Sequence, residues 1–127
     1  MDPDAPAVSV TVPATPGYVH VLRTVAGGVA ARVGWRLDAI DDLRLAVDEA
    51  AARVLAAGRA GELRLAIEPD GTSIAVEVAS DARTDAWPPG DPASALSLQI
   101  LSALADDVAF ELRDGGPAAR FTSGDRT

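Results

Sequence analysis

The 127-residue sequence contains no cysteine, no lysine and no asparagine. Without cysteine, disulfides, thiolate metal sites and cysteine nucleophiles are excluded. All 11 basic residues are arginines, and 19 acidic residues outnumber them, which gives a formal net charge of −8 at pH 7. An acidic chain is poorly suited to neutralise phosphates, so we expect no direct binding of nucleic acid and a basic protein as the preferred partner.

Long apolar runs are also missing. No stretch approaches the roughly twenty apolar residues that cross a bilayer, so we expect no membrane span. The first residues, Met1 to Pro6, lack the basic start and the apolar stretch of a secretory signal, which predicts a cytoplasmic protein. His20 is the only histidine and has no second ligand of a suitable type nearby, so no metal site is predicted.

The sequence does contain enough apolar residues for a folded core. Hydrophobic residues make up 48% of the chain and charged residues 24%, which is typical of a globular protein and not of a disordered one. A chain of this length can support one core. We therefore predict a single domain over residues 1–127, with short flexible termini at 1–6 and 123–127.

The spacing of apolar residues divides the chain into strands and helices. Val8, Val10 and Val12 alternate with polar residues as in a half-buried strand, and Asp38 is expected to be the N-cap of the second helix. The Asp70-Gly71 pair is typical of a hairpin turn. The spacing predicts strands at about 8–12, 62–68, 74–78, 108–112 and 119–122, helices at 18–33, 38–58 and 96–105, and a loop at 80–94.

Strands and helices fall in separate runs along the chain, which favours one sheet covered on one face by helices. We predict an α/β fold, a two-layer α/β sandwich with a mixed or antiparallel sheet of about four or five strands and three helices on one face. Trp87, in the proline-containing loop, could anchor a partner or cover the core of its own domain, and packing is the favoured interpretation.

Two segments carry a family resemblance. The first runs from Pro16 to Glu49 and reads PGYVHVLRTVAGGVAARVGWRLDAIDDLRLAVDE, and the second, from Ser97 to Phe110, reads SLQILSALADDVAF. Both resemble the bacterial anti-sigma-factor serine kinases, which belong to the histidine-kinase-like ATPases. The resemblance implies this fold, and a protein that sequesters a sigma factor and phosphorylates a serine of an antagonist protein.

The resemblance also implies a site for ATP and Mg²⁺ on the second helix. Glu49 matches the family's general base, although by itself it would be a solvent-facing charge or a partner of Arg53 one turn later. Arg53 stands where a family asparagine would hold Mg²⁺, and a guanidinium has no lone pair for a cation. We therefore expect magnesium binding in the usual manner to fail, although Arg53 could contact a nucleotide phosphate directly.

Two further motifs of the implied ATP site are altered in this sequence. Ser80, followed by Asp81, stands where a family aspartate would bind the adenine amino group. A stretch that includes Ser94 and Ser97 replaces the glycine-rich run that approaches the phosphates at the start of the third helix. The altered residues together predict a degenerate ATP site and a kinase activity that is impaired or lost.

The resemblance places the partner surface on the first helix. Arg23 matches a family arginine that contacts both the sigma factor and the antagonist, and Tyr18 and His20 lie near the same end. It also implies a homodimer through the first strand and first helix. Three functions stay open: a regulator that sequesters a sigma factor without effective kinase activity, an active serine/threonine kinase acting on an antagonist, and a binding module that has left transcription.

Overall fold

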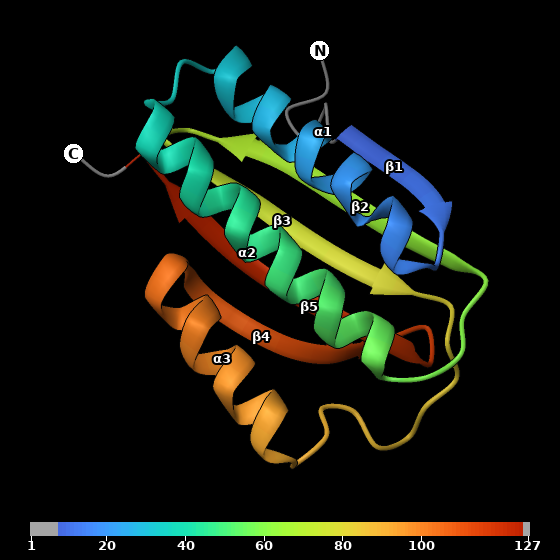
Figure 1. The fold of residues 1–127 in the computed structure, drawn as a ribbon. Helices are drawn as coiled ribbons and strands as arrows, with labels where there is room; N and C mark the ends of the chain where they lie inside the picture. The colour runs from blue at the N-terminus through green and yellow to red at the C-terminus, as the bar shows by residue number, and fades with distance from the viewer. Residues whose placement is uncertain (1–7, 126–127) are drawn as a thin grey trace.

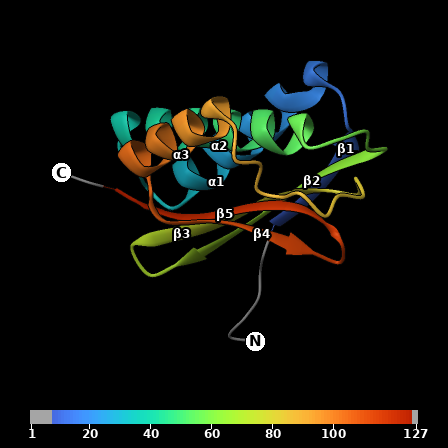
Figure 2. The ribbon, with the colours of Figure 1, turned by 90° about the horizontal axis from the view of Figure 1, so that it is seen from below.

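The computed structural model describes residues 8–125, which form a five-stranded antiparallel sheet with helices on one of its faces (Figures 1 and 2). The strands lie in the order β1-β2-β3-β5-β4 across the sheet. In chain order the elements are β1 (Val8–Pro13), a 3₁₀ turn (Pro16–Tyr18), α1 (Val19–Arg32), α2 (Leu37–Ala56), β2 (Glu62–Asp70), β3 (Ser73–Ser80), α3 (Pro92–Leu104), β4 (Asp106–Arg113) and β5 (Gly116–Gly124). The predicted two-layer α/β sandwich is confirmed.

The sheet buries one face against the helices because its strands alternate apolar and polar residues. β2 and β3 form the predicted hairpin, and its turn contains Gly71, whose φ of +63° lies in the left-handed region that favours glycine. The buried apolar residues of this hairpin are Leu63, Leu65, Ile67, Ile74, Val76 and Val78.

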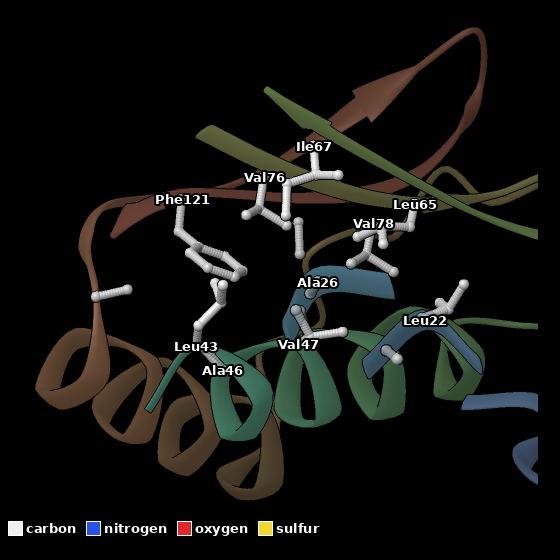
Figure 3. Close-up of a cluster of buried hydrophobic side chains, with 14 of the residues drawn as sticks. Leu22, Ala26, Leu43, Ala46, Val47, Leu65, Ile67, Val76, Val78 and Phe121 are labelled. Carbon is white, nitrogen blue, oxygen red and sulfur yellow. The ribbon is translucent and has the colours of Figure 1, made fainter. Parts of the chain in front are cut away.

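The core lies between this sheet face and the two long helices (Figure 3). Leu22 and Ala26 of α1 and Leu43 and Val47 of α2 are fully buried there, and Phe121 of β5 closes the core from the sheet side. A fully buried leucine or valine contributes roughly 1.5–3 kcal/mol relative to an exposed one, so this layer dominates the stability of the domain.

Trp87 lies in the segment between β3 and α3 and is buried. Its indole Nε1–H donates a hydrogen bond to the carbonyl oxygen of Ala118 at 3.2 Å, and its ring centroid lies 5.2 Å from that of Phe110. The interpretation of Trp87 as a packing residue is therefore confirmed, and its side chain covers the part of the sheet that β4 and β5 form.

Several predicted boundaries were wrong, and three of them have a clear physical reason. α2 begins at Leu37 after an N-cap at Arg36, so Asp38 lies in the first turn, where its charge faces the positive end of the helix dipole. α3 begins at Pro92, several residues before the expected start, because the Asp91 carboxylate caps it and Pro92 suits the first helical position.

The third boundary is the end of the last strand, β5. Ser123 and Gly124 were expected in a flexible terminus, but they are the last residues of β5, and Ser123 is buried opposite Ile74. Paired backbone groups and a buried side chain hold this end in the sheet. The flexible N-terminus expected at 1–6, and residues 126–127, lie outside the described residues.

Candidate functional site

Glu49 and Arg53 lie one turn apart on one side of α2, as their spacing predicted, and the structure shows that this side faces α3. The carboxylate of Glu49 accepts a hydrogen bond at Oε2 from the Ser97 hydroxyl of α3. Ser97 is almost completely buried and Glu49 is half-buried, so the hydroxyl of this bond lies away from water. The structure therefore directs the matched general base toward a serine of its own chain.

Arg53 and Ser94 lie near the start of α3, where Asp91 caps the helix. The backbone N–H of Ser94 donates to Asp91 Oδ1 at 2.7 Å. This bond, the nearby Ser94 hydroxyl and then the positive charge of Arg53 lower the pKa of the Asp91 carboxyl. Arg53 Nε and Ser94 Oγ are both buried without a hydrogen bond of good geometry.

These residues do not fit a magnesium nucleotide in the family's manner. The guanidinium of Arg53 cannot ligate a cation, and the carboxylate of Glu49 already accepts the hydroxyl of Ser97. At the α3 N-terminus, where backbone N–H groups would hold a phosphate, the carboxylate of Asp91 takes one of them and adds a negative charge.

Ser80 and Asp81 take opposite directions from the end of β3. Ser80 shares the buried face of the strand with Val76 and Val78, and its Oγ accepts a hydrogen bond from the Ala82 N–H at 3.3 Å. The position that alignment gives to the adenine-binding aspartate thus faces the helical layer, but it holds a hydroxyl that bonds locally.

The Asp81 carboxylate points to the start of β2 and has a structural role. Its Oδ1 accepts hydrogen bonds from the backbone N–H groups of Gly61, at 2.8 Å, and Glu62, at 3.0 Å. The N–H groups of Glu62 and Gly61 lower the pKa of the Asp81 carboxyl. Asp81 therefore fixes the start of β2, and the structure does not bring it to the residues around Glu49.

Gly116, at the start of β5, has a role that the apolar spacing of the sequence did not reveal. A Cβ at this position would collide with the carbonyl oxygen of Ser80 and lie 3.1 Å from that of Ala82. Only glycine lets the start of β5 pass this close to the end of β3. The sequence did contain a signal for this close approach, because a simple turn needs only one glycine and here Gly115 and Gly116 are adjacent.

The three residues expected on the partner surface gather at the N-terminal end of α1. Tyr18 is exposed, and the exposed ring of His20 donates from Nδ1 to the carbonyl oxygen of Gly17 at 2.9 Å. Arg23 Nη1 donates to Asp48 Oδ2 of α2 at 2.8 Å. Asp48 was missed, because residue spacing on α2 does not reveal which residue of α1 lies opposite.

A hollow of about 540 Å³ surrounds this ion pair, between the start of α1 and the end of α2. Most of its wall is apolar, with the guanidinium of Arg23 and the carboxylate of Asp48 as its charged groups. A mostly apolar hollow with a few fixed polar groups suits the binding of a protein side chain or loop. Its lining residues are Pro16, Val19, Arg23, Asp48, Ala52, Leu55 and Ala56.

Residues 12–123 match the family described as the histidine kinase-like ATPase domain. The chain belongs to this family. The family resemblance seen in the sequence is thereby confirmed for most of the chain. Within residues 8–125, no helix is long and apolar enough to cross a membrane, and no three acidic or histidine side chains gather as metal ligands would.

Two proteins of known name show which members of the family this chain is similar to. The anti-sigma-F factor RsbW of Mycobacterium tuberculosis is 36% identical over 104 residues, which cover 80% of this chain and 60% of that protein. The serine-protein kinase RsbW of Bacillus subtilis is 44% identical over 50 residues, which cover 39% of this chain and 31% of the kinase. The chain thus spans 60% of the length of the first relative and 31% of the length of the second, in both cases less than two thirds.

A crystal structure of the RsbU and RsbW domains of a Mycobacterium tuberculosis protein superimposes on 96% of this chain with a TM-score of 0.71. The match covers 34% of that chain at 18% sequence identity, so it supports the fold alone. The fold, the family and the RsbW-like character of the sequence therefore agree.

Proposed function

We propose that this chain is an anti-sigma-type regulator that binds and sequesters a sigma factor, and that an antagonist protein reverses this binding by partner switching. The similarity to the anti-sigma-F factor of Mycobacterium tuberculosis supports the proposal. So does the hollow around Arg23, which offers a partner an apolar wall and a guanidinium held in position by Asp48. An acidic residue of the partner would compete with Asp48 for Arg23.

We further propose that ATP-dependent kinase activity is impaired or lost. The observation that carries this is the hydrogen bond from Ser97 to Glu49, which occupies the general base with a hydroxyl of the same chain. Arg53 in place of a magnesium ligand and the capping carboxylate of Asp91 act in the same direction, since one repels the cation and the other repels a phosphate.

The second candidate is an active serine/threonine kinase that phosphorylates an anti-sigma antagonist. Glu49 favours this candidate, because it is a carboxylate on α2 that matches the general base implied by the family resemblance. The similarity to a protein of Bacillus subtilis that is named a serine-protein kinase also supports it. In this case Ser97 would have to release Glu49 when a nucleotide binds.

Calorimetric titration with ATP, with and without Mg²⁺, separates these candidates. For the wild-type chain we expect little heat and no strengthening by Mg²⁺. Arg53→Asn restores a neutral oxygen ligand and should gain Mg²⁺-dependent heat, whereas Arg59→Asn, an exposed arginine beyond the end of α2, is the matched control. Tight, Mg²⁺-strengthened binding by the wild type would instead favour the kinase.

Partner capture tests the regulatory half of the proposal separately. Sigma factors purified from the same organism should bind the wild-type chain, and Arg23→Ala should lose this binding. Arg64→Ala is the control, because Arg64 lies on the outer face of β2, away from the helices. Equal capture by both variants would exclude Arg23 as a contact residue.

The proposal extends to a homodimer in the cytoplasm. β1 is an edge strand of the sheet, and an apolar hollow of about 470 Å³ lies beside it. An edge strand with adjoining apolar surface favours pairing with a second chain. The residues that line this hollow are Val8, Val25, Gly28, Val29, Arg32, Val33 and Pro69.

A further inference from the structure

The helix α3 buries two serines, whereas three of its large apolar residues are exposed. Its three buried residues are Ser94, Ser97 and Leu101. Leu96, Leu98 and Ile100 are exposed by 57%, 42% and 36%. A helix on the surface of a globular protein normally turns its apolar stripe toward the core.

No charged residue interrupts this exposed surface. The sequence of α3, PASALSLQILSAL, has neither an acidic nor a basic residue over its 13 positions. At 1.5 Å per residue, this gives an uncharged helix about 20 Å long. Exposed apolar side chains gathered on one helix mark a site of interaction, whereas single exposed leucines do not.

Acidic residues surround one end of this helix. The contacts of Ser97 with Glu49 and of Asp91 with Arg53 show that α3 runs antiparallel to α2, so the end of α3 lies toward the start of α2 (Figure 1). The aspartates at this end, from the start of α2 and directly after α3, are Asp38, Asp41, Asp42, Asp106 and Asp107. The negative end of the α3 dipole points the same way.

The other end of α3 has a weaker charge. Asp91 caps it, and the positive charge of Arg53 lies close to this carboxylate. Leu96 and Ile100, one turn apart, therefore form an apolar ridge on one side of α3, while Leu98 lies on the other side of the helix, and the negative pole is at the C-terminal end only. A second copy of the chain fits this surface poorly, because each copy has a formal charge of −8 and the same acidic pole.

We propose that the exposed face of α3 binds an amphipathic helix of a partner protein, with an apolar stripe along its length and lysines or arginines grouped at one end. The apolar stripe covers Leu96 and Ile100, and the basic end lies over the acidic pole. Such a helix in a surface groove is a common mode of recognition. The surface is separate from the hollow around Arg23, so one partner could be held while another is exchanged.

The experiment uses the full chain and labelled synthetic helical peptides of 18 residues. One peptide has leucines at helical spacing and four lysines in its last turns, and a second has glutamates in place of these lysines. Fluorescence anisotropy should show binding of the lysine peptide and at least about tenfold weaker binding of the glutamate peptide. Binding of the lysine peptide should weaken as salt is raised.

Variants locate the binding surface. Leu96→Ser combined with Ile100→Ser should weaken binding of the lysine peptide at least about tenfold, because both side chains would lose their apolar contact. Leu112→Ser is the matched control, since Leu112 is 48% exposed but lies on β4. Arg23→Ala should also leave peptide binding unchanged, which distinguishes this surface from the one proposed for the sigma factor.

Three results would overturn the proposal. Equal loss of binding with Leu112→Ser would mean nonspecific attraction to an acidic protein, and full binding by the Leu96/Ile100 double variant would mean that another surface is used. A wild-type dimer in sedimentation that becomes monomeric in the double variant, together with no peptide binding, would show that a second copy covers α3.

Discussion

The two interfaces of α2 are built on different principles. Toward α1, the buried residues are apolar, with Leu22, Ala26 and Ala30 fully buried on α1, and the polar link between Arg23 and Asp48 lies at the surface. Toward α3, Leu101 is the one large apolar side chain that α3 buries completely, and two buried serines accompany it. Each fully buried apolar side chain stabilises the fold by roughly 1.5–3 kcal/mol, whereas a paired buried hydrogen bond contributes only about 0.5–1.5 kcal/mol.

This difference indicates that the α1–α2 interface contributes more to the stability of the fold than the α2–α3 interface does. The apolar interface fixes α1 and α2 on the sheet, so the surface around Arg23 has a rigid support. In the polar interface Ser97 of α3 donates to Glu49 of α2, and the Asp91 cap of α3 lies close to the charge of Arg53. We expect α3 to open locally at a lower free energy than α1.

A matched pair of leucine truncations tests this comparison most strongly. Leu22 and Leu101 are both fully buried, one on α1 and one on α3. Leu22→Ala should lower the free energy of unfolding by about 3–5 kcal/mol, and Leu101→Ala by about 2–3 kcal/mol, because a peripheral helix relaxes around the cavity more easily. Urea unfolding measures both, and equal losses would contradict the comparison.

Double-mutant cycles compare the polar links of the two interfaces. The coupling between Glu49 and Ser97, measured with Glu49→Gln and Ser97→Ala, should be about 1–2 kcal/mol because the serine is shielded from water. The coupling between Arg23 and Asp48 should be only about 0.2–1 kcal/mol, since their side chains are 36% and 31% exposed. A larger coupling energy for Arg23 and Asp48 than for Glu49 and Ser97 would contradict the conclusion that the link between α2 and α3 is the stronger polar link.

The smallest effect concerns the cap of α3. The pKa of the Asp91 carboxyl is lowered in the folded chain, so its contribution to stability is fully present above the ordinary value of 3.8 and is lost as pH falls through the folded value. Asp91→Asn keeps an oxygen that caps the helix but does not titrate.

Thermal unfolding between pH 2 and 6 measures this effect. The wild type should lose more stability on acidification than Asp91→Asn, and Asp91→Ala should already be weaker at neutral pH because it lacks the cap. Identical acid profiles for the wild type and Asp91→Asn would show that this carboxyl has no role in the acid sensitivity, which would then lie with carboxyls such as Asp81 and Glu111, whose pKa values are also lowered.

Periodicity predicted the number and order of the strands and helices, because apolar spacing records which face of each element is buried. It placed the start of α3 too late, since the helix begins with Pro92 and three small residues before the first large apolar residue, Leu96. The cap at Asp91 and the proline after it were local signals that could have located it. The spacing of four also correctly put Glu49 and Arg53 on one face of α2.

The sequence by itself determined the fold and the family, because these depend on residue type and local spacing. For the same reason it showed that position 53 has an arginine where the family resemblance implies an asparagine. Only the tertiary structure decided which polar groups meet. Ser97 reaches Glu49 across 48 residues of sequence and Arg23 reaches Asp48 across 25. Such pairs depend on how the helices pack on the sheet, and the polar pattern within a helix does not specify its neighbour.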